Sequence, residues 1–293
     1  MPELPEVETV RIGLNENTLG WQIEGGEVLL PRAIAYPDHP EAFLAALIGA
    51  EFTEWQRRGK YLIAKLSKNQ TQGDRLGVHL RMTGSLLWCD RDVAVGKHTR
   101  VRLFVKEKGK TKNEKGDIQK ELRFDDQRTF GKIWWVPSDQ PTESIITGLQ
   151  KLGLEPFDPE FTTEHLAAKL SRSGRPIKTV LLDQEMVAGI GNIYADESLF
   201  LGKIHPQKAA NSLNSEQVKA LHQGIIRSLS DGIAKGGTTF SSFQNVAGLK
   251  GNYIDTAWVF RRTGQPCNIC GTAISRIKLG GRSTHFCAQC QSL

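Results

Sequence analysis

The chain has 293 residues, which is long enough for two domains and a small third module. Hydrophobic residues make up 39% and charged residues 24%, fractions that are typical of a globular protein. No apolar run is long enough to span a bilayer and the acidic N-terminus is unlike a signal peptide, so we expect neither a membrane-spanning segment nor export. A formal net charge of +6 permits a polyanionic partner without identifying one.

The first residues, MPELPEVE, place a proline beside acidic side chains. Removal of Met1 is expected because residue 2 is small, and Pro2 then carries a free secondary amine. A terminal amine titrates near ~7.7–8.0, so part of it is neutral near pH 7 and can attack a carbon at the carbonyl oxidation level to form an imine. Glu3 lies directly beside this amine and Glu6 lies one helical turn on, and either carboxyl group suits a general acid or base.

The same stretch also suits the start of a helix. Proline in the first turn and glutamates near the N-terminus are both favourable there. Taken alone, the stretch favours this interpretation over a nucleophile. Apolar residues at helical spacing predict one buried face through about Leu19, and they are Leu4, Val7, Val10 and Leu14.

Short β-like runs separated by turn signals follow, with one helix expected around residues 43–48. Several short strands with little helix between them predict an antiparallel β-sandwich. Residues 106–120 are mixed in charge and almost free of apolar side chains, so we expect a disordered surface loop there and assign it no function. The β-like runs lie at residues 22–30, 61–66, 75–82, 100–105 and 131–136.

Three places in this half carry residues suited to chemistry. Lys60 follows a basic turn, where it is either a solvated hairpin tip or a cation that reaches a phosphate or a reacting group. Met82 precedes a glycine turn and can project from it, although methionine is usually a core residue. Arg128 and Phe130 lie two apart in a loop, where they can wedge into a base stack, and the alternative is a hairpin with Phe130 in the core.

The C-terminal half reads as helical after a linker-like segment at residues 137–141. Two of its helices flank a glycine-containing turn at residues 184–192, an arrangement that resembles a helix-turn-helix derivative. The backbone amides of this turn and the side chain of Asn192 suit a phosphate, and an ordinary helical hairpin is the alternative. The helices are expected at residues 145–152, 163–171, 176–183, 193–201 and 215–234.

Four cysteines near the C-terminus form the strongest local pattern. They make two CxxC pairs with sixteen residues between them, a spacing that fits a tetrahedral zinc site with four cysteine ligands. Four thiolates close the coordination sphere, so the metal is expected to be structural. Between the pairs, Arg276, Lys278 and Arg282 give a basic hairpin that suits phosphates. The ligands are Cys267, Cys270, Cys287 and Cys290.

Together these motifs resemble the formamidopyrimidine-DNA glycosylase family, the bacterial base-excision enzymes for oxidised purines. The resemblance covers nearly the whole chain and rests on PELPEVET, RRGKY, HLRMTG, RTFG, LLDQEMVAGIGNIYADESL and the terminal zinc hairpin. It implies an α+β multidomain protein with an N-terminal antiparallel β-sandwich and leading helix, a helical helix-two-turn-helix domain, and a four-cysteine zinc-finger β-hairpin. The expected boundaries are 1–136 for the sandwich, 137–150 for a linker, 151–240 for the helical domain, 241–260 for a lesion-covering loop and connection, and 261–293 for the zinc finger.

The resemblance also implies a role for each site residue. The damaged base is flipped out of the duplex, as base-modifying enzymes require. Pro2 would attack C1′ of the sugar and Glu3 would protonate the ring oxygen. Lys60 would help β-elimination and Arg282 would serve δ-elimination. The residues expected to contact DNA are Met82, Arg128 and Phe130, which fill the void left by the base, together with His98, Asn192 and Glu6; residues 238–253 would cover the flipped base.

Two features depart from the family pattern. Thr129 stands where the family usually has a second basic residue, so one phosphate contact is expected to be weaker. The charged segment at residues 106–120 looks longer than the usual strand connection.

Two rival interpretations stay open. The endonuclease VIII branch of the same superfamily excises oxidised pyrimidines, but Leu4 and the loop with Arg128 and Phe130 favour the purine branch. A non-catalytic DNA-binding protein that used the zinc hairpin and the helical turn would not need Pro2, Glu3 and Lys60 together. The expected protein is therefore a bifunctional glycosylase and lyase, a cytoplasmic and nucleoid-associated bacterial monomer that holds one zinc ion, binds duplex DNA containing oxidised purines and has no membrane partner.

Overall fold

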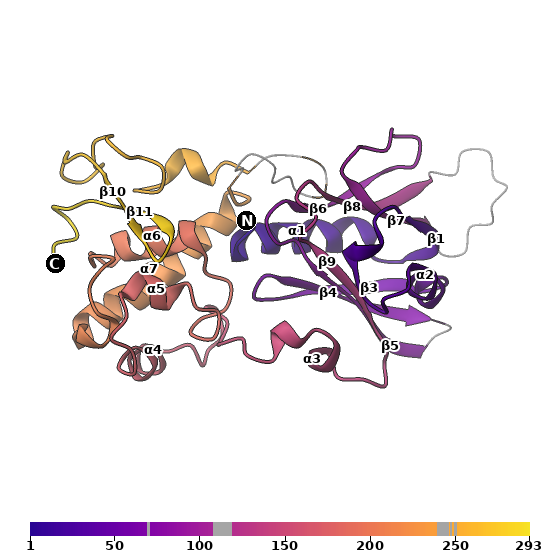
Figure 1. Ribbon diagram of the computed structural model, residues 1–293, viewed down its shortest axis with the longest axis horizontal. Coiled ribbons are helices and arrows are strands. Elements are labelled where there is room, and N and C mark those ends of the chain that lie inside the picture. The colour runs from indigo at the N-terminus through magenta and orange to yellow at the C-terminus, as the bar shows by residue number, and fades with distance from the viewer. Residues whose placement is uncertain (69–70, 108–118, 239–245, 247, 249–250) are drawn as a thin grey trace. The chain divides into compact units, whose positions relative to one another are not determined.

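The computed structural model describes residues 1–68, 71–107, 119–238, 246, 248 and 251–293 (Figure 1). The chain divides into two compact units, which are described separately. Unit 1 holds residues 1–2, 6–150 and 239–251, and unit 2 holds residues 3–5, 151–238 and 252–293. Most of the charged segment at 106–120 and of the expected lesion-covering loop at 238–253 lies outside the described residues.

In its described residues, unit 1 has nine strands, and their order in the sheet is β2-β9-β5-β4-β3-β1-β7-β8-β6. The link between β3 and β1 is a single register pair, Gln22 with Glu51, and there the ladder divides into the two layers of a sandwich. Every pair is antiparallel except β2 with β9, which is parallel, so the predicted antiparallel sandwich is correct except at this edge. The strands are β1 (Trp21–Val28), β2 (Ile34–Tyr36), β3 (Glu51–Arg58), β4 (Tyr61–Lys68), β5 (Thr71–His79), β6 (Gly84–Asp90), β7 (Thr99–Glu107), β8 (Lys120–Asp126) and β9 (Lys132–Val136).

The leading helix α1 (Leu4–Thr18) forms as its apolar spacing predicts. Val7, Val10 and Leu14 are fully buried in the core of the sandwich, where each contributes roughly 1.5–3 kcal/mol relative to exposure. The second helix, α2 (Pro40–Leu47), begins at a proline and buries Phe43 and Leu47 in the same core.

The helix expected at residues 145–152 is not formed. Instead α3 (Thr142–Ile145) ends early and a 3-10 turn, η2 (Thr147–Leu149), follows it. The chain approaches Tyr61 closely here, because a Cβ added at Gly148 would lie 2.1 Å from the Tyr61 hydroxyl oxygen. The helix ends before this contact, because the backbone at Ile146 has φ −95 and ψ 71, outside the helical region.

Unit 2 is helical, and side chains cap two of its helices. Thr162 caps α4 (Thr163–Leu170) by accepting a hydrogen bond from the His165 amide, and Asn214 forms a capping box with Gln217 at the start of α7 (Ser215–Ala234). Between them lie α5 (Ile177–Leu181) and α6 (Asn192–Leu201). No helix within the described ranges is long and apolar enough to cross a membrane.

The C-terminal part of unit 2 is a β-hairpin of β10 (Ser275–Leu279) and β11 (Arg282–Phe286). A small core of Phe200, Val259, Ile274 and two of the cysteines packs behind it. The hairpin lies beside α6 (Figure 1), so residues near position 190 and residues near position 283 share one site.

Candidate active site and nucleic-acid interface

The N-terminus of α6 holds the carboxylate of Glu3. Glu3 is 3% exposed, and its two oxygens accept hydrogen bonds from the amides of Ile193 at 3.0 Å and Tyr194 at 3.2 Å. An anion is stabilised there because the first amides of a helix have no partner within the helix and the helix dipole is positive at that end. The amides at this helix start are predicted from the sequence to bind a phosphate, but in the structure they hold Glu3 in its place.

The glycine turn before α6 leaves room for the Glu3 carboxyl group and bonds the backbone of the next residue, Leu4. A Cβ at Gly191 would lie 2.3 Å from Glu3 Cδ, so only glycine admits the carboxyl group. Gly189 has φ +89 and accepts a hydrogen bond from the Leu4 amide at 3.0 Å. The predicted glycine-containing turn therefore positions Glu3 and Leu4, which follow Pro2 in the chain; Pro2 is itself buried.

In unit 1, Lys60 is buried and is not a solvated hairpin tip. It lies in the turn between β3 and β4, is 6% exposed, and follows Gly59 with φ +57. Arg57 fastens this turn to α1, because its guanidinium bonds the Glu8 carboxylate at 2.9 Å and the Gly59 carbonyl at 3.1 Å. Burial raises the pKa of Glu8, but hydrogen bonds from Arg11 and Arg57 outweigh it and hold that pKa below its usual value.

His79 is a site residue for which the sequence predicts no role. It is 6% exposed, packs edge-on against Tyr61 at 4.4 Å between ring centroids, and accepts a hydrogen bond on Nδ1 from the Arg81 amide at 3.0 Å. Burial, with the charges of Arg81 and Lys60, lowers the pKa of His79 to about 3. The imidazole is therefore neutral near pH 7 and adds no charge beside Lys60.

The expected DNA wedge is exposed in unit 1. Phe130 is 51% exposed and Met82 is 37% exposed, so neither lies in the core. The Arg128 guanidinium lies 4.9 Å from the centroid of the Phe130 ring, a cation–π contact that orders the two side chains together.

Asp126, buried at the end of β8, holds these loops in place. Its carboxylate accepts hydrogen bonds from the amides of Gly131 at 2.7 Å and Arg128 at 3.2 Å, and also from the Thr83 hydroxyl beside Met82. Its own amide donates to the His98 carbonyl at 2.9 Å. One aspartate thus connects the loops that carry four predicted DNA-contacting residues, although Glu6, predicted with them, is 1% exposed and lies inside the protein.

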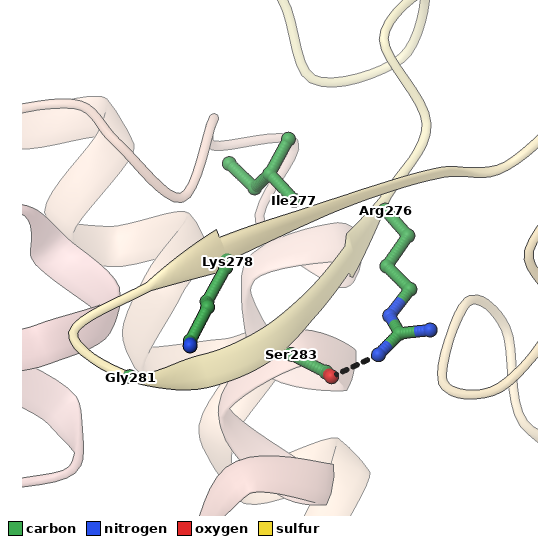
Figure 2. A pocket seen from close by; sticks show the side chains of 5 residues that line it. All are labelled: Arg276, Ile277, Lys278, Gly281 and Ser283. Carbon is green, nitrogen blue, oxygen red and sulfur yellow. Dashed lines mark hydrogen bonds between the residues drawn. The ribbon is translucent and has the colours of Figure 1, made fainter.

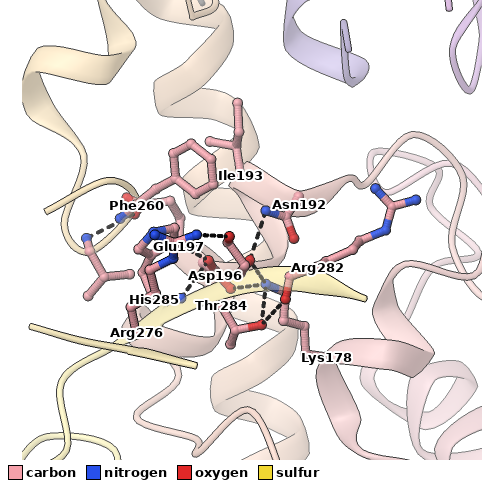
Figure 3. A network of polar contacts seen from close by, with 12 residues as sticks. Lys178, Asn192, Ile193, Asp196, Glu197, Phe260, Arg276, Arg282, Thr284 and His285 are labelled. Atoms are coloured by element: carbon pink, nitrogen blue, oxygen red, sulfur yellow. Dashed lines mark hydrogen bonds and ion pairs between the residues drawn. The ribbon is translucent and has the colours of Figure 1, made fainter. Parts of the chain in front are cut away.

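In unit 2, a buried polar network joins α5, α6 and the zinc hairpin (Figure 3). Lys178 Nζ forms an ion pair with Asp196 at 2.6 Å and donates to the Ser283 carbonyl at 2.9 Å and the Thr284 hydroxyl at 2.8 Å. Asn192 donates to the same Ser283 carbonyl at 3.0 Å. Burial lowers the pKa of Lys178, and the charge of Asp196 opposes that shift.

The network fixes the strand that begins with Arg282. Asp196 also accepts from the His285 amide at 2.9 Å, and its neighbour Glu197 is fully buried and accepts from the amides of Trp258, Val259 and Phe260 at 2.8 to 3.0 Å. The side chain of Arg282 extends away from the network (Figure 3). Its guanidinium is therefore available to a ligand while its backbone is held.

The outer face of the hairpin carries the basic residues expected there. Arg276, Ile277, Lys278, Gly281 and Ser283 line a hollow (Figure 2), and Arg276 donates to the Ser283 hydroxyl at 2.8 Å. Two cations around one hollow suit an anion such as a phosphate.

The four predicted cysteines come together as one metal site. Their Sγ atoms all lie within 4.8 Å of one another, with 3.9 Å between Cys267 and Cys290 and 3.4 Å between Cys270 and Cys287. Four thiolates about 2.3 Å from a zinc ion at tetrahedral angles lie about 3.8 Å apart, so the donor set fits zinc. The amides of Ile269 and Cys290 also point at ligand sulfurs, at 3.4 and 3.5 Å. The site is positioned to bind one zinc ion.

Comparison with known proteins agrees with this geometry. Three family models match the chain: the formamidopyrimidine-DNA glycosylase N-terminal domain over residues 1–133, the formamidopyrimidine-DNA glycosylase H2TH domain over 152–244, and the zinc finger found in FPG and IleRS over 264–293. The formamidopyrimidine-DNA glycosylase of a Nostoc species is 55% identical over 293 residues, with 99% of this chain and 100% of the relative covered. The chain belongs to the formamidopyrimidine-DNA glycosylase family.

Solved structures of family members are similar over the whole chain. The Lactococcus lactis Fpg with a DNA that contains an oxidised pyrimidine has a TM-score of 0.86 and 35% identity, and covers 100% of both chains. A mutant of that protein with Fapy-dG DNA has a TM-score of 0.85 at the same identity and coverage. A MutM bound to DNA with carbocyclic 8-oxo-G also has a TM-score of 0.85, at 35% identity over both full chains. The predicted family and its α+β architecture of sandwich, helical domain and zinc hairpin are thereby confirmed.

Proposed function

We propose that this chain is a bifunctional DNA glycosylase and abasic-site lyase that excises oxidised purines from duplex DNA in base excision repair. The observation that carries the proposal is the position of the Glu3 carboxylate, which is bound at the N-terminus of α6. Glu3 directly follows Pro2 in the chain. A carboxyl group that was only part of a helix start would lie in solvent, whereas Glu3 is 3% exposed and held by two amides.

The chemistry follows from the residues at this site. The nitrogen of Pro2, freed by removal of Met1, forms a bond to C1′ of the damaged nucleotide while the bond from C1′ to the base breaks. The base leaves with the proton that this nitrogen loses. Glu3 donates a proton to the sugar ring oxygen, the ring opens, and an iminium joins Pro2 to C1′. Loss of a proton from C2′ then expels the 3′ phosphate, and the second elimination expels the 5′ phosphate.

The cations have supporting roles in this proposal. Lys60, beside the neutral His79, neutralises a phosphate at the reacting nucleotide, and Arg282 binds a flanking phosphate and serves the second elimination. Arg128, Phe130 and Met82 fill the space that the flipped base leaves, while His98 and Asn192 bind backbone phosphates. The proposal includes these roles and a DNA contact by Glu6. It also includes the domain boundaries given above and a monomeric, nucleoid-associated protein in a bacterial cytoplasm.

A borohydride trap tests the proposal. The processed protein is mixed with a duplex that carries 8-oxoguanine opposite cytosine, borohydride is added, and the products are separated on a denaturing gel. We expect a covalent protein–DNA band that disappears when Met1 is retained, because the nitrogen of Pro2 is then an amide. A band formed with an oxidised pyrimidine alone would assign the protein to the rival branch, and tight binding without any band would leave a DNA-binding protein only.

A Pro2→Gly variant separates chemistry from binding. Base excision should fall sharply while affinity for the duplex stays close to that of the wild type. Equal losses of excision and affinity would instead mean that Pro2 has a structural role.

A further inference from the structure

Two cations lie beside the wedge loop of unit 1 without a role in the proposed chemistry. Arg32 belongs to a 3-10 turn, η1 (Pro31–Ala33), yet its guanidinium donates to the hydroxyl of Thr129, 97 residues away, at 2.5 Å. Lys132 Nζ donates to the Arg32 carbonyl at 2.5 Å. The parallel pairing of β2 with β9, which aligns Ile34 with Ile133, brings the turn and the loop together.

Within the described part of the chain, the charge of this pair is not neutralised by a carboxylate. Among the residues that the structure describes, no carboxylate forms an ion pair with Arg32 or Lys132. The nearby Asp126 is 1% exposed, and its oxygens accept from the Arg128 and Gly131 amides. With Arg128 itself, three cations therefore gather at one exposed loop, and such a group favours a polyanion.

The hydrogen bond to Thr129 gives the Arg32 side chain a direction. Thr129 also has φ +58, a left-handed conformation that is uncommon for a β-branched residue and is characteristic of functional loops. Thr129 uses one donor of the planar guanidinium, and the other donors are left for the oxygens of a bidentate acceptor such as a phosphate.

We propose that Arg32 and Lys132 form a phosphate clamp that binds the DNA backbone next to the wedge of Arg128 and Phe130. The inference rests on the proposed function, because it takes duplex DNA as the ligand. The clamp fixes the depth and register at which the wedge enters the base stack. Thr129 is its positioning residue, since the hydroxyl orients the guanidinium without touching DNA.

The experiment measures dissociation constants by fluorescence anisotropy over a salt series. The probe is a duplex with a tetrahydrofuran abasic analogue, which has no leaving group at C1′ and therefore cannot form the imine. Arg32→Ala should weaken DNA binding roughly tenfold, as loss of a charged hydrogen bond does. The negative slope of the logarithm of the binding constant against the logarithm of the salt concentration should also become less steep by about 0.9. Thr129→Val keeps every charge, so it should weaken binding less and leave the slope unchanged.

Two further variants separate a local contact from a general effect of charge. Lys65→Ala removes one positive charge from the same unit, but Lys65 pairs with Glu54 at 2.7 Å, so its slope should equal that of the wild type. Adding Thr129→Arg to Arg32→Ala returns a guanidinium to the loop and should restore most of the affinity. A midpoint of thermal unfolding equal to that of the wild type will show that a variant is folded. If Arg32→Ala lowers this midpoint, Arg32→Gln is the second variant.

An unchanged slope in folded Arg32→Ala or Arg32→Gln would overturn the clamp, as would the same loss in Lys65→Ala. These outcomes are distinct from failure of the proposed function. If the protein were not a lyase, the borohydride band of the wild type would be missing. If only the clamp were wrong, that band would form and the salt slope of the Arg32 variants would match that of the wild type.

Discussion

Replacing Lys178 with methionine removes the cation from the centre of the network that anchors the zinc hairpin. The Lys178 and Asp196 side chains are 1% and 0% exposed, so the carboxylate left behind cannot be solvated. Removing one partner of such a pair costs about 3–5 kcal/mol of the free energy of unfolding. The Ser283 carbonyl and the Thr284 hydroxyl also lose a donor, which places the expected loss at the upper end of that range.

The assay is urea unfolding at pH 7 with zinc present. The double variant Lys178→Met with Asp196→Asn removes both charges while the asparagine oxygen can still accept from the His285 amide, so it should be more stable than the single variant. Arg175→Met is the control, because the Arg175–Asp183 pair is 54% and 36% exposed and should contribute less than about 1 kcal/mol. A loss below about 1 kcal/mol in Lys178→Met, or a double variant less stable than the single one, would refute the reasoning.

Three other changes test the site. Gly191→Ala should reduce base excision far more than duplex affinity, measured by single-turnover kinetics and anisotropy, because its Cβ would displace the Glu3 carboxyl group. His79→Gln should flatten the pH dependence of the free energy of unfolding. The pKa of His79 is about 3 in the folded protein, below the usual 6.5, so the unfolded chain binds a proton more readily than the folded one. The wild type therefore loses stability as the pH falls from about 6.5 toward 3, by at most about 1.4 kcal/mol per pH unit. Cys287→Ser should release zinc, seen with a metal indicator, and weaken DNA binding.

Each of these expectations has a contrary outcome. Proportional losses of excision and affinity in Gly191→Ala would mean that the turn only supports the fold. A His79→Gln profile as steep as that of the wild type between pH 4 and 6.5 would show that another group dominates acid destabilisation. Full activity of a metal-free Cys287→Ser protein would contradict the structural role of the zinc site.

The elements with regular patterns were predictable, and those stabilised by buried charges were not. Helix α1, the capped helices α4 and α7, and strands β4 and β7 follow from apolar spacing and capping residues. Strand β8 was missed because Glu121 and Arg123 look like surface residues, yet they are 0% and 4% exposed and pair with each other. Strand β2 has three residues, and only its pairing with the distant β9 defines it.

The site shows the same division. The identities of Pro2, Glu3 and the four cysteines follow from local motifs, since each motif is complete within a few residues. The binding of the Glu3 carboxylate at the start of α6 cannot be predicted from a local motif, because it joins residues 190 positions apart. The role of Asp126 in holding the DNA-contacting loops cannot be predicted from a local motif either, although aspartates often accept hydrogen bonds from backbone amides at the start of a turn.

Folding kinetics add a consequence of the strand order. Strands β8 and β9 are consecutive in the chain but lie near opposite ends of the strand ladder, so the loop with Arg128 and Phe130 connects those two ends. Its shape depends on pairings with distant strands, and such non-local contacts form slowly because loop-closure entropy opposes them. We therefore expect this loop to be among the last parts of unit 1 to acquire its native shape. A nascent or partly folded chain would then carry basic charge without a formed wedge, and only a completely folded molecule would be able to interrupt a base stack.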